Sequence, residues 1–162
     1  LMGLPPSDSG EHTYTEMADV IRQRSADATA DLEELWRRIA FSVLISNVDD
    51  HLHNHGFLHV EGALWRLSPA FDVNPFPDRV RELKTWISEE AGPAASVEAL
   101  MGTTRYFGLT STHALRVLSE VAHAVAAWRD EAVRLGFSED EIARFADAFE
   151  HEERETAQRY LA

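Results

Sequence analysis

The 162-residue sequence predicts a mainly α-helical domain that carries one small β-hairpin. Apolar residues recur at the three- and four-residue spacing of amphipathic helices in several long stretches. One pair of short apolar runs, separated only by Glu-Gly, has the composition of a hairpin. A hydrophobic share of 44% at this length is enough for one buried core, so we expect a single domain over residues 1–162.

The N-terminal part should supply the central helix. Residues 1–12 contain glycine, two prolines and small polar residues, and we expect a flexible N-terminal segment. A first helix is predicted over residues 14–25. A second helix is predicted to open at a capping box formed by Asp31 and Glu34. Its apolar stripe widens to all sides near its end, so we expect it to be buried and to stop near Asn47.

A hairpin and a loop should follow this helix. The runs GFLHV (56–60) and ALWRLS (63–68) are short and apolar, and Glu-Gly between them suits a tight turn. The next stretch, SPAFDVNPFP (68–77), contains three prolines, which break both helices and strands. We therefore expect it to be an ordered loop.

The C-terminal half returns to a helical pattern. A short helix is predicted over residues 94–101. A long amphipathic helix is predicted from about residue 112 to residue 135, where Gly136 stops it. Ser138 and Glu141 have the spacing of a capping box, which predicts the start of the last helix.

Composition narrows the classes of function. A net charge of −13 repels phosphate backbones, so we expect no direct binding of nucleic acid. The longest nearly apolar run, residues 39–46, is too short to cross a bilayer, so we expect no membrane span. The absence of cysteine excludes disulfides and thiolate zinc sites and suits a reducing cytoplasm. The first residue is Leu1 and no basic leader follows it, so we expect no signal peptide and a piece of a longer chain.

The most polar stretch follows the predicted central helix. Residues 45–58 read ISNVDDHLHNHGFL and place two aspartates, two asparagines and three histidines just before the hairpin. Asp72 lies just after the hairpin, so Asp49, Asn54 and Asp72 can converge at one end of it. Oxygen ligands of this kind suit Mg²⁺ bound to phosphates. An aspartate beside such a site can orient a hydroxyl and take its proton.

These residues carry a resemblance to a known family. NVDDHLHNHGFL (47–58) followed by WRLSPAFDVNP (65–75) resembles the C-terminal part of HipA-type proteins, the serine/threonine kinase toxins of bacterial toxin–antitoxin modules. The family pattern is D-x-H-x-x-N, a hairpin, and then R-L-[ST]-P-x-[YF]-D, and both parts occur here at hairpin distance. The resemblance implies a protein-kinase-like C-lobe, which is a helical bundle with one small hairpin.

The resemblance also implies a role for each matched residue. Asp49 matches the catalytic aspartate, and His51 matches the histidine that braces the catalytic loop. Asn54 and Asp72 match the residues that bind Mg²⁺ and, through it, ATP. A cytoplasmic bacterial setting, a protein substrate and a DNA-binding antitoxin as partner of the full-length protein are implied in the same way.

The sequence departs from these patterns at two points. Many family members carry lysine or arginine just before the asparagine, where this chain has His53, so a contact with phosphate there would depend on pH. A glycine-rich phosphate loop and a strand lysine are absent from the 162 residues, whose only lysine is Lys84, after the metal-binding loop. We therefore expect the C-lobe of a longer kinase, inactive without the N-lobe that clamps the nucleotide.

Other interpretations stay open at this point. The same surface suits a non-catalytic module that binds an antitoxin or a regulator. The run HLHNH resembles the H-x-H-x-D-H zinc motif of metallo-β-lactamase-like hydrolases, although Asn54 replaces its aspartate. Capping and turn chemistry would explain any one of Asp49, Asn54 and Asp72 alone. Asp50 suits a turn or a supporting position, His55 and His59 suit half-exposed hairpin positions, and Arg66 either pairs with an acid or lies in solvent.

Overall fold

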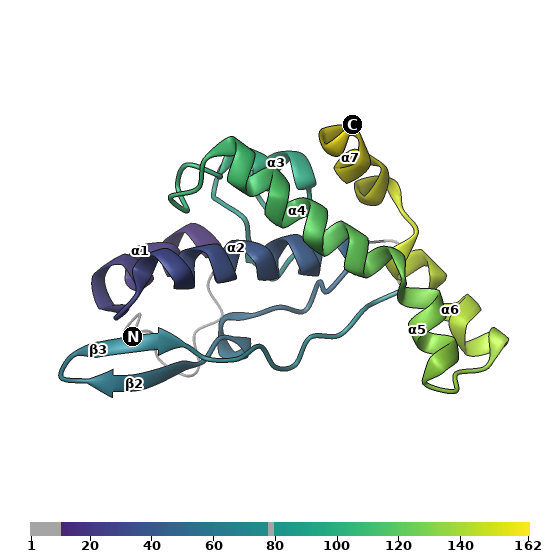
Figure 1. Cartoon of the computed structure of the whole chain (residues 1–162), viewed down its shortest axis with the longest axis horizontal. Helices are drawn as coiled ribbons and strands as arrows, with labels where there is room; N and C mark the ends of the chain where they lie inside the picture. The colour runs from purple at the N-terminus through teal and green to yellow at the C-terminus, as the bar shows by residue number, and fades with distance from the viewer. Residues whose placement is uncertain (1–10, 78–79) are drawn as a thin grey trace.

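The computed structural model describes residues 11–77 and 80–162, and it confirms a mainly α-helical domain with a small hairpin (Figure 1). The helices are α1 (Tyr14–Arg24), α2 (Ala28–Leu44), α3 (Val97–Gly102), α4 (Ser111–Ala126), α5 (Trp128–Arg134), α6 (Glu139–Phe149) and α7 (Glu152–Leu161), with a short 3₁₀ helix η1 at Leu52–Asn54. The strands are β1 (His12–Thr13), β2 (Phe57–Glu61), β3 (Leu64–Leu67) and β4 (Thr85–Trp86).

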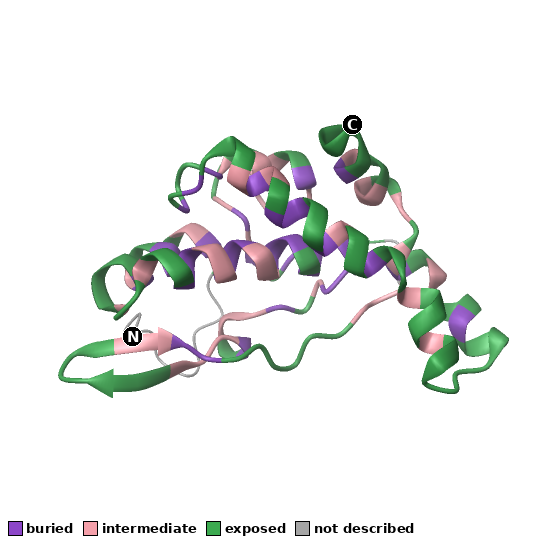
Figure 2. Ribbon diagram, viewed as in Figure 1, coloured by how far each residue is buried: buried purple, intermediate pink, exposed green. Residues whose placement is uncertain are grey.

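Helix α2 lies at the centre of the molecule, as predicted (Figure 1). Helices α1, α3, α4 and α7 all pack against it, and buried residues follow its length (Figure 2). Leu35, Trp36 and Ile39 of α2 and Leu118 of α4 are completely buried. Removing one such apolar side chain from water contributes about 1.5–3 kcal/mol, so these contacts hold α2 in place. No helix in the described ranges is both long and apolar enough to cross a membrane.

The described strands form two small sheets of two strands each. Strands β2 and β3 form the predicted antiparallel hairpin, with Phe57 opposite Leu67. Strands β1 and β4 pair in parallel, with His12 opposite Thr85. This second sheet was not predicted, because two-residue strands leave no periodic pattern in a sequence. Residues 1–10 of the predicted flexible segment lie outside the described residues, and its end contributes to β1.

The predicted capping box of α2 is wrong. The N-cap is Asp27, whose carboxylate accepts a hydrogen bond from the Ala30 amide at 3.1 Å. Both Asp27 and Asp31 are suitable capping residues by type, and the helix begins at the earlier one. Glu34 lies inside the helix and pairs with Arg38 at 2.8 Å instead of reaching back to a cap.

Asp31 is a buried link between α2 and β3. It is 2% exposed, and its carboxylate accepts hydrogen bonds from Arg66 Nε at 2.9 Å, the Leu67 amide at 3.0 Å and the Ser25 hydroxyl at 2.6 Å. A buried carboxylate is stable only when it is paired and hydrogen bonded, and these three donors meet that requirement. Arg66 therefore pairs with an acid, and the hairpin is fixed against the central helix.

The single helix predicted over residues 112–135 is in fact two helices. Helix α4 ends at Ala126, because the backbone turns at Ala127, whose amide bonds to the Ala124 carbonyl three residues back at 3.3 Å. After the turn, Trp128 stacks on Phe149 with ring centroids 4.4 Å apart and an interplanar angle of 7°. Stacking of this kind favours the turn over a continuous helix.

The remaining helix ends agree more closely with the sequence. Gly136 follows α5 with a φ of 88°, a left-handed conformation that suits glycine at a helix end. Ser138 and Glu141 form the predicted capping box of α6, but the single last helix predicted from this point is two helices, α6 and α7. The short helix predicted over residues 94–101 is α3, and α2 ends at Leu44 rather than near Asn47.

Candidate functional site

The candidate site begins where α2 ends. Ser46 has a φ of 54°, which places it in the left-handed region that a non-glycine residue seldom adopts. Two contacts hold it there: its hydroxyl donates to the Ala148 carbonyl at 3.1 Å, and its carbonyl accepts from the Phe76 amide at 3.2 Å. The turn at Ser46 therefore directs residues 47–55 away from the helix in one fixed direction.

Asn47 connects this turn to the loop that follows the hairpin. Its side-chain amide donates to Ser42 Oγ at 3.1 Å, and its Oδ1 accepts from the Asn74 amide at 3.2 Å. Asn47 is 1% exposed, so both contacts are made inside the protein. No role was predicted for this residue. Its position directly after a buried apolar helix is the available signal, because a polar side chain there needs an internal partner.

The neighbouring residues Asp49 and Asp50 have opposite environments. Asp49 is exposed and, within residues 11–77 and 80–162, its carboxylate makes no hydrogen bond or ion pair. Asp50 is 5% exposed and accepts a hydrogen bond from the Tyr14 hydroxyl at 2.5 Å. Burial, together with the charge of Asp50 and this hydrogen bond, raises the pKa of Tyr14 well above its usual range. Asp50 is therefore buried and paired with Tyr14, whereas the carboxylate of Asp49 is open to solvent.

Asn54 closes the loop on Asp49. The residue lies at the end of η1 and is 7% exposed. Its Nδ2 donates to the backbone carbonyl of Asp49 at 3.4 Å, a carbonyl that also accepts from the His51 amide at 3.0 Å. This arrangement leaves the side-chain oxygen of Asn54 as an acceptor, which is the atom that a hard cation would bind.

The loop that contains Asp72 packs against the start of the hairpin. A Cβ atom on Gly56 would lie 2.8 Å from Ser68 Oγ and 3.3 Å from Phe71 Cε1, so only glycine fits there without a shift. The Ser68 amide also donates to the Gly56 carbonyl at 2.9 Å. Asp72 is exposed with a φ of 54°, and its carboxylate accepts from the Asn74 side chain at 2.9 Å.

The predicted catalytic aspartate and the two predicted Mg²⁺ ligands thus lie in two adjoining loops. Asp49 and Asn54 belong to one loop and are joined by a hydrogen bond. Asp72 belongs to the next loop, which is tied to the first through Asn47 and Gly56, but no hydrogen bond joins Asp72 to Asp49 or Asn54. Amide and carboxylate oxygens are the donors that Mg²⁺ prefers, so this donor set fits that ion.

The histidines around the loop have different surroundings. His51 is half-buried, its Nδ1 is buried without a hydrogen-bond partner, and its ring lies edge-on to His53 at 5.6 Å. His59 is exposed and packs against Trp65. The expectation for His55 was wrong, because its side chain is only 4% exposed. In the part of the chain that the structure describes, no group of three or more histidines and acids is arranged to hold a metal ion.

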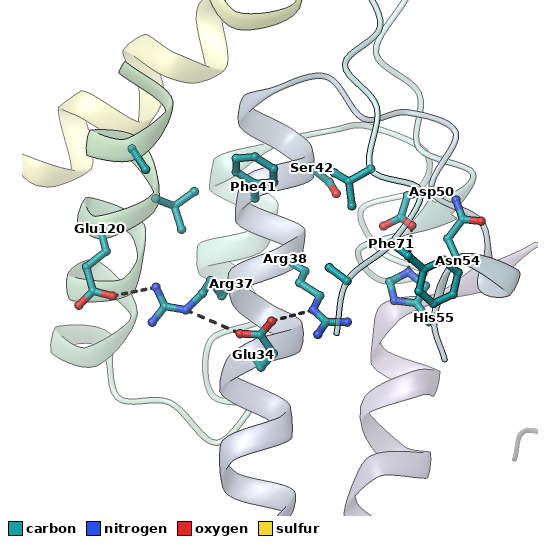
Figure 3. A pocket seen from close by; sticks show the side chains of 14 residues that line it. Glu34, Arg37, Arg38, Phe41, Ser42, Asp50, Asn54, His55, Phe71 and Glu120 are labelled. Atoms are coloured by element: carbon teal, nitrogen blue, oxygen red, sulfur yellow. Dashed lines mark hydrogen bonds and ion pairs between the residues drawn. The ribbon is translucent and has the colours of Figure 1, made fainter. Parts of the chain in front are cut away.

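A pocket of about 340 Å³ lies beside the loop, between α2, α4 and the segment after the hairpin (Figure 3). Its polar end is formed by Asp50, Asn54 and His55. Its apolar wall is formed by Phe41, Ala70, Phe71, Val73, Val121 and Ala124. The arginines at its edge are already paired, Arg37 with Glu120 and Arg38 with Glu34, and neither Asp49 nor Asp72 lines it. The pocket therefore adjoins the predicted catalytic loop without containing its two exposed carboxylates.

The order of these parts defines a class of protein. A buried helix leads into a loop with aspartate and asparagine, a hairpin follows, and a second loop presents another aspartate. This is the arrangement of a mainly α-helical, protein-kinase-like C-lobe.

The family follows from comparison with known proteins. The family model for the HipA-like C-terminal domain matches residues 1–128, and the chain belongs to that family. The match includes both loops and the hairpin, and residues 129–162, with most of α5 and all of α6 and α7, lie beyond it.

Two relatives are longer than the part that this chain matches. A Haemophilus influenzae protein named "Putative kinase" is 32% identical over 69 residues, which cover 41% of this chain and 20% of that protein. A chain in the solved structure of the Shewanella oneidensis MR-1 toxin–antitoxin system HipA, HipB and its operator DNA has a TM-score of 0.70 and 16% identity. That match covers 92% of this chain and 36% of the Shewanella chain, and at this identity it shows a shared fold.

Proposed function

We propose that this chain is the C-lobe of a HipA-like serine/threonine protein kinase. In this proposal Asp49 acts on the acceptor hydroxyl, Asn54 and Asp72 hold Mg²⁺ against the ATP phosphates, and His51 braces the loop. The observation that carries the proposal is the packing of the two loops against each other, with Asp49 and Asn54 in one and Asp72 in the other, in a chain of the HipA-like family.

The surroundings of each residue support its assigned part. Asp49 is exposed and has no partner within the described residues, so its carboxylate is available to orient a hydroxyl and take its proton. Asn54 donates to the Asp49 backbone carbonyl, which brings the proposed ligand and the proposed base together in one loop. Bound Mg²⁺ would neutralise the charge that develops on the transferred phosphoryl group.

A complete active site requires parts that these 162 residues do not contain. The sequence has one lysine, Lys84, and no glycine-rich phosphate loop, so in this proposal an upstream N-lobe clamps the nucleotide and the chain is inactive without it. The matched parts make up only 20% of the Haemophilus influenzae protein and 36% of the Shewanella chain, which supports a longer protein in this proposal.

We propose a DNA-binding antitoxin as the partner of the full-length protein, in the bacterial cytoplasm. The support is the complex of the Shewanella relative with HipB and operator DNA. The charge of −13 on this chain opposes direct contact with phosphates and leaves that contact to the partner. The substrate in this proposal is a protein with an accessible serine or threonine.

The test uses a protein extended upstream of Leu1 and incubated with Mg²⁺ and labelled ATP. Label should pass to a protein hydroxyl, and Asp49→Ala should lower that transfer by about 100-fold or more. Asp140→Ala, which removes an exposed carboxylate from α6, should leave the transfer unchanged. Transfer that survives Asp49→Ala would make the assigned role wrong. An extended protein that transfers no label would favour the non-catalytic binding module, and stoichiometric zinc in the purified protein would favour a hydrolase.

A further inference from the structure

We infer that Tyr14, Asp50 and His55 form a buried clamp that positions the catalytic loop, an inference that rests on the function proposed above. Asp50 follows Asp49 in the sequence, and His55 follows Asn54. The two residues proposed for chemistry therefore each have a neighbour inside the clamp. Tyr14 comes from a different element, α1, and lies 36 residues before Asp50.

The contacts within the clamp are short and lie out of solvent. Tyr14 is completely buried, and its hydroxyl donates to Asp50 Oδ2 at 2.5 Å. His55 Nε2 lies 3.0 Å from Asp50 Oδ1, although the two atoms are not aligned as a hydrogen bond. The Tyr14 and His55 rings meet edge to face, with centroids 5.7 Å apart. Asp50 and His55 lie together at the polar end of the pocket (Figure 3).

Burying the Asp50 carboxylate costs free energy, so a role in core packing does not explain its presence. A buried charge is stable only with good partners, and an apolar residue of similar volume would serve the core at least as well. Within the described residues the Asp50 carboxylate has one hydrogen-bond donor, Tyr14, and one close ring, His55. Both partners restrict where the loop backbone can lie, so the clamp fixes position rather than adding apolar contact.

A further contact holds the same loop two residues before Asp50. The Lys84 amide donates to the Val48 carbonyl at 3.0 Å, just before β4. Strand β4 pairs with β1, and β1 leads directly into Tyr14 at the start of α1. The loop is therefore fixed between two points of one connected framework. Asp49 projects from the part of the loop that lies between them.

The clamp should matter for turnover more than for binding of substrate. None of its members is proposed to contact substrate, yet a displacement of about 1 Å at a catalytic group can cost on the order of 100-fold in rate. Tyr14→Phe removes only the hydroxyl, and we expect it to lower kcat of the upstream-extended kinase by about 10- to 100-fold. The KM for the protein substrate should change by less than about threefold, because the residues that bind it are intact.

A second tyrosine that bonds to helix α1 supplies a matched control. Tyr106 also donates its hydroxyl to an aspartate, Asp19 of α1, at 2.6 Å, but this pair is exposed. Tyr106→Phe removes the same atom from the same kind of hydrogen bond, and it should leave kcat unchanged. Asp50→Asn keeps an oxygen that can accept from Tyr14 and should retain more activity than Asp50→Leu, which removes it.

Hydrogen exchange tests the clamp without relying on activity. The amides of His51, Asn54 and His55 form hydrogen bonds inside the loop at 2.9–3.2 Å. In the 162-residue chain, Tyr14→Phe should speed exchange in residues 48–55 by about tenfold or more relative to α4, and Tyr106→Phe should not. Asp50→Asn gives a second comparison if Tyr14→Phe fails to fold.

The outcomes separate this inference from the proposed function. Faster exchange confined to the loop, with a lower kcat, supports the clamp. Unchanged exchange and unchanged kcat in Tyr14→Phe would overturn it while leaving the role of Asp49 intact, and equally faster exchange over the whole chain would reduce the clamp to a contribution to stability. If the extended protein transfers no phosphate, the proposed function fails, and the exchange comparison still decides whether the clamp fixes the loop.

Discussion

Replacing Asp31 by alanine should destabilise the protein far more than replacing an exposed aspartate. Asp31 is 2% exposed and joins α2 to the hairpin through Arg66, Leu67 and Ser25. The alanine variant leaves all three donors without this acceptor. Because the hairpin separates the two loops of the candidate site, the perturbation also tests how firmly those loops are connected to the core.

The magnitude follows from the burial of each donor. Leu67 is buried, so its unpaired amide should cost about 1–3 kcal/mol. The Ser25 hydroxyl is only partly buried and should add about 0.5–1 kcal/mol. The Arg66 side chain is 41% exposed and can turn to water, so loss of its ion pair should add at most about 1 kcal/mol. We expect a loss of about 3 kcal/mol in the free energy of unfolding.

The assay is urea denaturation at neutral pH, followed by tryptophan fluorescence and circular dichroism. Asp19→Ala is the matched control, because Asp19 accepts from Arg22 and Tyr106, each at 2.6 Å, on an exposed face of α1. It should cost about 0–1 kcal/mol. Losses for the two variants that agree within about 0.5 kcal/mol would refute the reasoning, because burial would then have no effect on the value of these contacts.

Two further predictions concern the C-terminal half. Burial and the nearby charge of Arg81 lower the pKa of His151 from 6.5, so the unfolded chain binds a proton more readily than the folded chain as the pH falls below about 6.5. The free energy of unfolding should therefore fall as the pH is lowered from about 6.5 to the pKa of His151 in the folded protein. His151→Gln should flatten this part of the pH dependence. An unchanged slope would contradict the assignment to His151. Gly136→Ala should cost about 1–2 kcal/mol because Gly136 has a φ of 88°. Gly102→Ala, in the exposed last turn of α3, should be neutral or stabilising by about 0.5–1 kcal/mol in the same denaturation assay, and equal costs at the two glycines would be evidence against the backbone explanation.

Local patterns in the sequence were sufficient for several elements. The apolar stripe of α2, the Glu-Gly turn of the hairpin and the capping box at Ser138 each lie within a few residues, so neighbouring side chains decide the conformation. The same local rule failed at Asp31, where Asp27 caps the helix. The role of Asp31 depends on Arg66, which is 35 residues away, and no local pattern contains that information.

Long-range contacts also explain the other differences between the predicted and the observed secondary structure. Helix α4 ends at Ala126 because Trp128 stacks on Phe149, a residue of a later helix. The pairing of β1 with β4 joins strands of two residues each, which are too short for a periodic signal.

In the candidate site, too, local spacing could be read from the sequence but long-range contacts could not. Asp49, Asn54 and Asp72 could be selected from their order and spacing, and the structure places them in two loops that pack together. The residues that hold those loops, Asn47 and Asp50, could not be assigned partners from sequence. Their partners Asn74 and Tyr14 are brought to them only by the fold.

In the proposed kinase, Asp49 acts on the acceptor hydroxyl while Asp72 holds the metal–nucleotide. Separate measurements of ATP binding and phosphate transfer on one set of proteins test this division most directly. In the upstream-extended protein, calorimetry with Mg²⁺ and ATP should give Asp49→Asn an affinity within about threefold of the unsubstituted protein, while its phosphate transfer falls by about 100-fold or more. Asp72→Asn should lose Mg²⁺-dependent binding of ATP as well as transfer. Full transfer by Asp49→Asn, or equal losses of ATP binding in both variants, would contradict the division of roles between the two loops.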